Sequence, residues 1–542
     1  MFPGLWRTPS VHLDGHPVER ATIDAMYPGK YAVERADQPA FIMATSGEAV
    51  TYGEYEARTN RLAHLLRDQG LQRLDHYSIF MENNARYLEM CGAGERSGLY
   101  YTCINSHLTT DELAYIVNDS DSRVFITSRE KLDVAREVVA MCPKIERWLV
   151  VDGPADEAPF EDYLTAVSEF PDTPIADERQ GSSMLYSSGT TGRPKGIVRQ
   201  LADVGPDQAL ALMQFLLGQW RYREGQTYLS PAPLYHSAPQ GAVGLTIRVG
   251  GTAIIMERFD PEQYLQLVEQ YRVTHSQLVP TMFNRMLKLP DEVKQRYDLS
   301  SLEAVVHAAA PCPVPVKEQM IAWWGPVIIE YYAATEAIGF TSCDSHEWLA
   351  HKGTVGQCKL GVLHILDDEF NEVPNGTPGT IWFEAPAGLN YWKDPAKTKE
   401  ATTPDGRMHT TGDVGYVDDE GWLFLTDRKS FMIISGGVNI YPQETENLLV
   451  THPKVADAAV FGVPHPDLGE EVKAVIQPMP GIEGTPELER ELITFCQEHL
   501  SKQKCPRSVD FMAELPRLPT GKLYKKTLRD SYWGEGQSRI VK

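Results

Sequence analysis

Residues 186–196 read YSSGTTGRPKG and concentrate hydroxyl groups, glycines and cations in one short stretch. Four side chains supply hydroxyl donors: Ser187, Ser188, Thr190 and Thr191. Three glycines let the backbone bend and approach a ligand closely: Gly189, Gly192 and Gly196. Lys195 and Arg193 add positive charge. Together these groups suit a polyphosphate, although the stretch is not a Walker loop, because GxxxxGK[ST] cannot be aligned to it.

The length and composition of the chain indicate a globular protein with at least two domains. Its 542 residues exceed what one hydrophobic core usually serves. A content of 42% hydrophobic and 23% charged residues is ordinary for a folded protein. The formal net charge of −23 disfavours nucleic acid as a partner, because its phosphates would be repelled.

Cysteine usage and the ends of the chain predict a cytoplasmic protein. The eight cysteines are scattered, with no CxxC pair and no Cys/His cluster at zinc spacing, so we read them as reduced packing residues. The first residues lack the apolar core of a signal peptide, and residues 540–542 are not a peroxisomal signal. No apolar run is long enough to span a membrane. A homodimer is among the assemblies that the sequence allows.

Local patterns predict alternating helices and strands, which is typical of an α/β fold. Residues 51–70 predict a helix with a capping box formed by Thr51 and Glu54, and residues 109–112 repeat this capping pattern. Residues 253–279 read strand, helix, strand, which predicts a βαβ unit with parallel strands.

The character of the chain changes near residue 428. The charged stretch DRKS is followed by alternating short strand and helix patterns over about 110 residues, which suits a small α+β domain. We therefore expect a large N-terminal domain of layered α/β subdomains at residues 1–427, a hinge at 428–431 and a small mobile α+β domain at 432–542.

Five further motifs accompany the glycine-rich stretch in a fixed order: YHSAP at 235–239, HAAAP at 307–311, YAATE at 332–336, TGD at 411–413 and TGK at 520–522. Any one of them alone would more often be a turn or a packed strand end. As a set they resemble the signature of the adenylate-forming superfamily, which comprises acyl-CoA ligases, adenylation domains and beetle luciferases. The chain looks most like the fatty-acyl-CoA synthetase branch of the acyl-CoA ligases, and the likeness runs from about residue 30 to about residue 530.

The resemblance implies a binding site for ATP and Mg²⁺. The residues that it assigns to nucleotide contacts are Ser187, Ser188, Gly189, Thr190, Thr191, Gly192, Lys195, Ala309, Ala310, Tyr332, Thr335, Asp413 and Arg428. A flat Tyr332 ring suits a purine, and the Asp413 carboxylate can accept hydrogen bonds from both ribose hydroxyls. Glu336 is the implied Mg²⁺ ligand, a hard oxygen donor next to phosphates. Ala333 stands where many relatives carry glycine.

The catalytic groups implied by the resemblance are Lys522, Thr191, Glu336 and His236. In relatives the lysine of TGK contacts both the substrate carboxylate and the α-phosphate, and a cation is needed there because two anions must approach. His236 lies at the mouth of the acyl pocket in this reading. Relatives rotate the C-terminal domain between two half-reactions, which brings a glycine loop, here Gly436 and Gly437, to the pantetheine of coenzyme A. The hinge then falls at Ser430, where most relatives carry aspartate or lysine.

The expected activity is an ATP-dependent acid–thiol ligase (AMP-forming) that makes an acyl-adenylate and then an acyl-CoA thioester. Acetate-specific relatives block their pocket with a tryptophan that aligns near Ala333, so alanine here predicts a medium- or long-chain fatty acid, or an arylalkanoic or cyclic acid. A bulky residue from the stretch MQFLLGQWRY at 213–222 would argue against this. The partners are therefore a small carboxylic acid, ATP and coenzyme A.

Three other functions fit part of the pattern. A stand-alone adenylation enzyme that loads a carrier protein would form the adenylate but give no free thioester with coenzyme A. A luciferase-like oxygenase fits less well, because the region after Leu234 differs. A non-catalytic nucleotide sensor would keep the stretch at 186–196 but has no need of Lys522.

Replacing Lys522 with alanine separates a ligase from a sensor. We expect acid-dependent pyrophosphate release to fall by orders of magnitude, because the fixed positive charge at the reacting anions is lost. ATP binding by the Lys522→Ala protein, measured by calorimetry, should persist. Unchanged pyrophosphate release would contradict the assigned role of Lys522.

Overall fold

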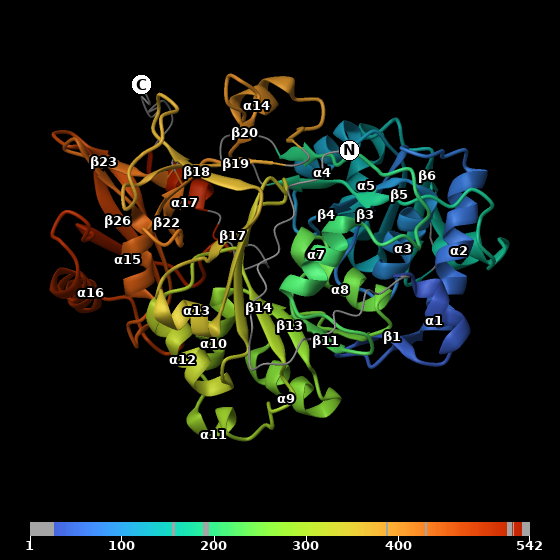
Figure 1. Ribbon diagram of the computed structural model, residues 1–542, viewed down its shortest axis with the longest axis horizontal. Helices are drawn as coiled ribbons and strands as arrows, with labels where there is room; N and C mark the ends of the chain where they lie inside the picture. The colour runs from blue at the N-terminus through green and yellow to red at the C-terminus, as the bar shows by residue number, and fades with distance from the viewer. Residues whose placement is uncertain are drawn as a thin grey trace.

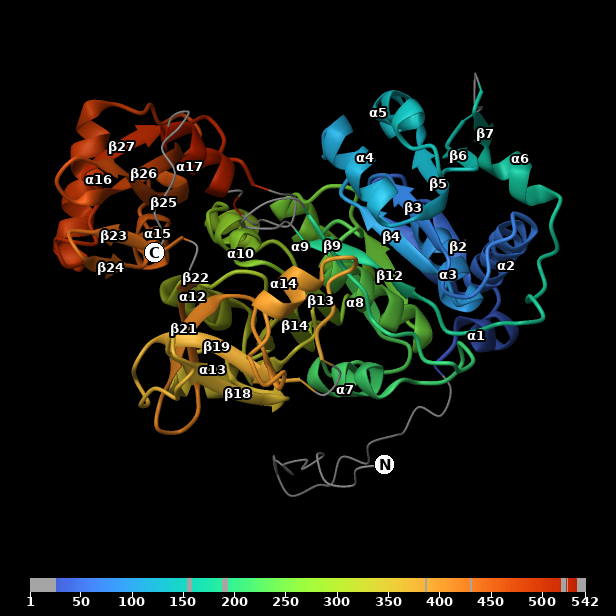
Figure 2. The same cartoon turned by 90° about the horizontal axis from the view of Figure 1, so that it is seen from above.

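The computed structural model describes residues 26–153, 158–187, 194–385, 388–428, 431–517, 523 and 525–533. A large body, whose described residues form four sheets, one of them two-stranded, carries a smaller body at its C-terminal end (Figures 1 and 2). This arrangement confirms the predicted α/β fold with a large N-terminal and a small C-terminal part. No helix among the described residues is long and apolar enough to cross a membrane.

The N-terminal six-stranded sheet is parallel throughout and has buried strands. Its order is β7 (Phe160–Asp162), β6 (Arg147–Val151), β5 (Ser122–Ser128), β3 (His76–Phe80), β4 (Tyr100–Ile104) and β8 (Ser182–Ser183). The helices of this region are α1 (Pro28–Glu34), α2 (Tyr52–Asp68), α3 (Tyr87–Ser97), α4 (Thr110–Asp119), α5 (Leu132–Val138) and α6 (Tyr163–Ser168). All five residues of β3 and of β4 are buried, as expected for a parallel sheet covered on both faces, and most of them are apolar; His76, Ser78 and Thr102 are the polar exceptions.

The predicted helix starts in this region are confirmed. Thr51 caps α2 by accepting from the Glu54 backbone N–H, and the Glu54 carboxylate accepts from the Thr51 backbone N–H in return. Thr109 and Glu112 form the same capping box at α4. Each box satisfies two backbone donors that the first helical turn would otherwise leave unpaired.

A nine-stranded sheet forms the centre of the large body. Its order is β17 (Gln357–Leu360), β16 (Phe340–Asp344), β15 (Ile328–Ala333), β14 (Ala304–His307), β13 (His275–Leu278), β11 (Thr227–Ser230), β12 (Thr252–Ile255), β1 (Pro39–Met43) and β2 (Ala49–Thr51). Its helices are α7 (Ala211–Gln219), α8 (Ser237–Arg248), α9 (Pro261–Tyr271), α10 (Pro280–Leu287), α11 (Asp291–Lys294), α12 (Val314–Trp324) and α13 (Ser345–Ala350). The βαβ unit predicted at 253–279 is β12–α9–β13. Its strands are parallel as expected, but β11 lies between them and pairs with both.

A smaller antiparallel sheet packs beside β17. It contains β18 (Val362–Leu366), β19 (Gly379–Glu384), β20 (Met408–His409), β21 (Asp413–Val417) and β22 (Leu423–Arg428), with α14 (Pro395–Glu400) nearby. Its core contains Ile338, just before β16, and Val355, just before β17, so it is continuous with the large body.

The C-terminal part has its own five-stranded sheet and its own apolar core. The elements are β23 (Ile433–Ser435), β24 (Val438–Ile440), α15 (Pro442–Leu449), β25 (Val455–His465), β26 (Gly469–Pro478), α16 (Pro486–His499), β27 (Ser508–Phe511) and α17 (Lys525–Trp533). It touches the large body at Lys288, after α10, whose Nζ donates to the backbone oxygens of Val450 at 3.5 Å and Val455 at 2.5 Å. Residues 429–430 lie outside the described residues, so the hinge at 428–431, with Ser430, stays a prediction.

Candidate active site

One cavity of about 2530 Å³ lies where the large body meets the C-terminal part. The segments that follow the carboxyl ends of β13, β14 and β15 border it, together with the start of α8 and the hairpin of β9 (Leu185–Ser187) and β10 (Lys195–Ile197). Carboxyl ends of parallel strands are the usual place for ligands in such sheets. Nine residues predicted from the sequence line this cavity: Ser187, Lys195, His236, Ala309, Ala310, Tyr332, Thr335, Glu336 and Asp413.

The hairpin β9–β10 brings both ends of the glycine-rich stretch to the cavity. Ser187 pairs with Lys195 and Tyr186 with Gly196 in an antiparallel register. A Cβ added at Gly196 would lie 2.7 Å from the Met184 side chain and 3.0 Å from Cβ of Trp392, so this glycine is required by packing. Between the paired ends, Ser188, Gly189, Thr190, Thr191 and Gly192 lie outside the described residues.

Tyr391 contacts both Glu336 and Lys195, and no sequence motif had predicted its role. The Tyr391 hydroxyl donates to Glu336 Oε1 at 2.9 Å, and Lys195 Nζ lies 5.0 Å from the centre of the Tyr391 ring. Burial and the nearby Lys397 lower the pKa of Lys195, whereas Glu400 and Glu336 act in the opposite direction. A single tyrosine thus positions a carboxylate and a cation on one wall of the cavity.

Arg199 is a second cation of this wall that the sequence did not single out. Its Nη2 donates to the backbone oxygen of Thr335 at 2.8 Å, which ties the end of β10 to the segment after β15. Burial lowers the pKa of Arg199, and the charge of Glu336 partly offsets this effect. An arginine keeps its charge in spite of such a shift, so the wall presents two cations and one carboxylate.

Asp413 and Tyr332 are hydrogen-bonded to each other. The hydroxyls of Tyr332 and Thr411 both donate to Asp413 Oδ2 at 2.8 Å. Asp413 is paired with Arg428 in the register of β21 and β22, which places the two residues side by side on the sheet. Of Arg428 only the backbone is described, so its predicted contact stays a prediction.

Two alanines with left-handed backbone border the cavity. Ala309 follows β14 with φ of 74°, and Ala337 follows Glu336 with φ of 55°. Positive φ is uncommon for a residue with a Cβ and costs free energy, and such residues gather at functional sites. Here the two turns direct the segments after β14 and β15 along the cavity.

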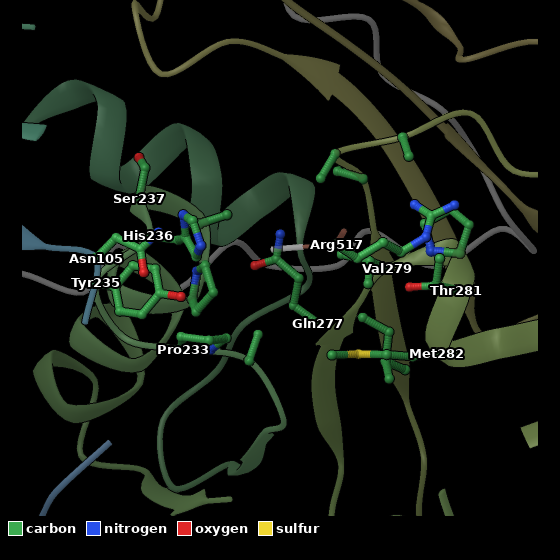
Figure 3. Close-up of a pocket in the computed structure, with 18 of the residues that line it drawn as sticks. Asn105, Pro233, Tyr235, His236, Ser237, Gln277, Val279, Thr281, Met282 and Arg517 are labelled. Atoms are coloured by element: carbon green, nitrogen blue, oxygen red, sulfur yellow. The ribbon is translucent and has the colours of Figure 1, made fainter. Parts of the chain in front are cut away.

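The apolar side of the cavity lies between α7, α8 and the end of β15. His236 is the N-cap residue of α8, and its ring lies 4.4 Å from that of Tyr235 (Figure 3). From the stretch 213–222, Leu216 and Trp220 line the cavity, and Trp220 packs against Tyr331 at 5.8 Å between ring centres. Leu216 and Trp220 are the bulky residues of 213–222 that argue against a large acid, whereas the small side chain of Ala333, which also lines the cavity, argues for one.

The C-terminal part presents its last segments to the cavity. Arg517 and Leu523 line it and form a backbone bridge that encloses the undescribed residues 518–522, including Lys522. The neighbouring Lys525 is buried and pairs with Glu446 at 2.7 Å. The turn of Gly436 and Gly437 between β23 and β24 is exposed and is not among the lining residues. The structure therefore does not bring these two glycines together with the other predicted site residues.

The described residues contain no group of three or more His, Cys, Asp and Glu side chains that could hold a metal ion. A dedicated metal cage is therefore not formed by this part of the chain. Mg²⁺ in nucleotide sites is usually held by one or two carboxylates and the phosphates themselves, and Glu336 is such a single carboxylate.

Two protein families match this chain. Residues 29–391 match the family described as AMP-binding enzyme, and residues 444–522 match the AMP-binding enzyme C-terminal domain. The first match covers the hairpin, Glu336 and Tyr391.

Individual relatives are similar over nearly their whole length. A feruloyl-CoA synthase from Amycolatopsis sp is 33% identical over 92% of this chain and 98% of its own. The fatty acid–[acyl-carrier-protein] ligase ScoC of Streptomyces coeruleorubidus is 30% identical over 91% of this chain and 94% of its own. The crystal structure of ATP-bound MatB from Rhodopseudomonas palustris superimposes with a TM-score of 0.76 and 27% identity, covering 94% of this chain and 99% of that one.

Replacing Tyr391 with phenylalanine tests its positioning of Glu336. This variant keeps the aromatic ring beside Lys195 but loses the hydrogen bond to Glu336. The loss of that bond costs roughly 1.5 kcal/mol, or about tenfold in the affinity of the site for Mg²⁺. We expect the Mg²⁺ concentration needed for half-maximal pyrophosphate release to rise by about that factor, with a larger rise for Glu336→Gln. Tyr416→Phe, outside the cavity, is the control; an unchanged Mg²⁺ requirement in Tyr391→Phe would contradict the positioning role.

Proposed function

Because this chain belongs to the AMP-binding enzymes, an ATP-dependent family of adenylate-forming ligases, we propose that it joins a carboxylic acid to coenzyme A through an acyl-adenylate. This proposal rests on one observation: a single cavity is lined by Ser187, Lys195, Glu336 and Asp413. These groups come from segments far apart in the sequence, and their chemistry matches a nucleoside triphosphate.

In the first half-reaction the acid carboxylate attacks the α-phosphorus of ATP and pyrophosphate leaves. Little covalent chemistry is required of the protein, since phosphoryl transfer depends on positioning and on charge. Asp413 and Tyr332 hold the ribose and adenine in this proposal, while the glycine-rich stretch at 186–196 and Lys195 bind the phosphates. Mg²⁺ held by Glu336 would offset charge on the phosphate oxygens, and a carboxylate fixed by Tyr391 fits that ion.

Lys522 supplies the cation between the two reacting anions. The position of Arg517 and Leu523 at the cavity supports this role, because they bracket residues 518–522. His236, at the start of α8, borders the entrance of the acyl pocket.

The second half-reaction is attack of a thiol on the adenylate carbonyl, with AMP as the leaving group. We infer that the C-terminal part turns about the hinge at 428–431 before this step. The exposed turn of Gly436 and Gly437 lies away from the cavity, so the arrangement described here suits the first half-reaction. After the rotation these glycines would leave room for pantetheine.

The acid is a medium- or long-chain fatty acid, or an arylalkanoic or cyclic acid, in this proposal. Ala333 is small and lines the cavity at the end of β15, and the wall of Leu216, Trp220 and Phe340 is apolar. The named substrates of the two relatives, ferulate and a fatty acid, are both larger than acetate.

A second candidate function is loading of a carrier protein instead of coenzyme A. The likeness to ScoC, a ligase whose name gives an acyl-carrier protein as acceptor, favours it. The likeness to a feruloyl-CoA synthase favours coenzyme A.

The test is an assay of pyrophosphate release with Mg·ATP over a panel of carboxylic acids, with coenzyme A, with a phosphopantetheinylated carrier protein, or with neither. We expect one acid class to give pyrophosphate and, with coenzyme A present, a thioester that mass spectrometry identifies. Thioester on the carrier protein alone would favour the second candidate. Acetate as the best acid would contradict the proposed substrate class.

A further inference from the structure

A polar group interrupts the apolar wall of the acyl pocket at Gln277. This residue lies on β13 and projects into the space between His236 and the segment of Val279 and Thr281 (Figure 3). Its Nε2 donates to the Tyr331 hydroxyl at 2.7 Å, and Tyr331 in turn packs against Trp220 and stacks on Phe340. All four residues line the cavity.

Two polar atoms of this wall have no hydrogen-bond partner among the described residues: Gln277 Oε1 and Trp220 Nε1. Gln277 is 7% exposed and Trp220 is 4% exposed, so both side chains are buried in the wall of the cavity. A buried polar atom without a partner is costly, and such atoms in a native structure call for an explanation.

The two atoms have complementary chemistry and flank the same tyrosine. The amide oxygen of Gln277 is an acceptor and the indole N–H of Trp220 is a donor. If the oxygen and nitrogen of the Gln277 amide exchange places, the Tyr331 hydroxyl donates to the amide oxygen. The amide NH₂ is then the group without a partner. In either orientation one amide group of Gln277 stays unsatisfied, and a hydroxyl can serve it because a hydroxyl both donates and accepts.

We propose that Gln277 and Trp220 select an acid that carries a hydroxyl group remote from its carboxylate. The hydroxyl bonds to the Gln277 amide and accepts from Trp220 Nε1, while the carbon skeleton lies along Leu216 and Phe340. A purely hydrocarbon tail would leave both polar atoms unpaired. This inference rests on the proposed function and narrows its substrate class.

The test compares matched acids that differ by one hydroxyl. The pairs are 3-phenylpropanoate with 3-(4-hydroxyphenyl)propanoate and decanoate with 10-hydroxydecanoate, each assayed for pyrophosphate release at varied acid concentration. In at least one pair we expect kcat/KM to favour the hydroxylated acid by about ten- to a hundredfold, mainly through KM, because a site built for a hydroxyl rejects the analogue that lacks it.

Gln277→Leu should abolish or reverse this preference, and Trp220→Phe should reduce it about fivefold or more. Gln319→Leu, on the exposed face of α12, is the matched control and should keep the wild-type preference. Equal or better use of the unsubstituted acid in both pairs by the wild-type enzyme would overturn the inference, as would a preference that survives Gln277→Leu. Neither result bears on the proposed function. That function is contradicted if no acid in the broader panel yields pyrophosphate.

Discussion

The pairing of Ser187 with Lys195 across the hairpin β9–β10 is the contact on which the site depends. A phosphate-binding loop works only if its backbone and its cations face the same ligand, and this register brings both ends of the loop to one cavity. The close approach of Trp392 to Gly196 holds the hairpin against the segment that carries Tyr391. A side chain at Gly196 would push these apart and move Lys195 away from Glu336.

The cavity lining is acidic overall, like the whole chain, but cations gather at one part of it. The protein is strongly acidic, yet Lys195, Arg199 and Arg517 border the place proposed for the triphosphate. Glu336 lies near Lys195 and is oriented by Tyr391, whereas Arg517 is paired with Asp457. The C-terminal part adds the segment that contains Lys522, so the site is assembled from two parts of the protein. Such an arrangement lets one cavity serve both proposed half-reactions, because rotation of the C-terminal part would exchange the segment of Lys522 for another segment at the cavity.

Local sequence predicted the features that short segments determine by themselves. The capping boxes of α2 and α4 and the strand–helix–strand unit at 253–279 are of this kind. The family also followed from motifs that occur in a fixed order, and the family comparison confirmed it. The insertion of β11 between β12 and β13 was not predictable, since strand order depends on packing between distant segments. Tyr391, Arg199 and the Gln277–Tyr331 pair were missed for the same reason: each acts through a contact that joins residues more than fifty positions apart.

The central claim is that the acid is activated as its adenylate. It is tested most directly with an acid whose carboxylate carries oxygen-18, converted to thioester by the enzyme with unlabelled ATP and coenzyme A. If the carboxylate attacks the α-phosphorus, one labelled oxygen stays with the nucleotide, and mass spectrometry will find AMP enriched by one oxygen-18. Label in orthophosphate with ADP as the nucleotide product would show an acyl-phosphate route and contradict the account.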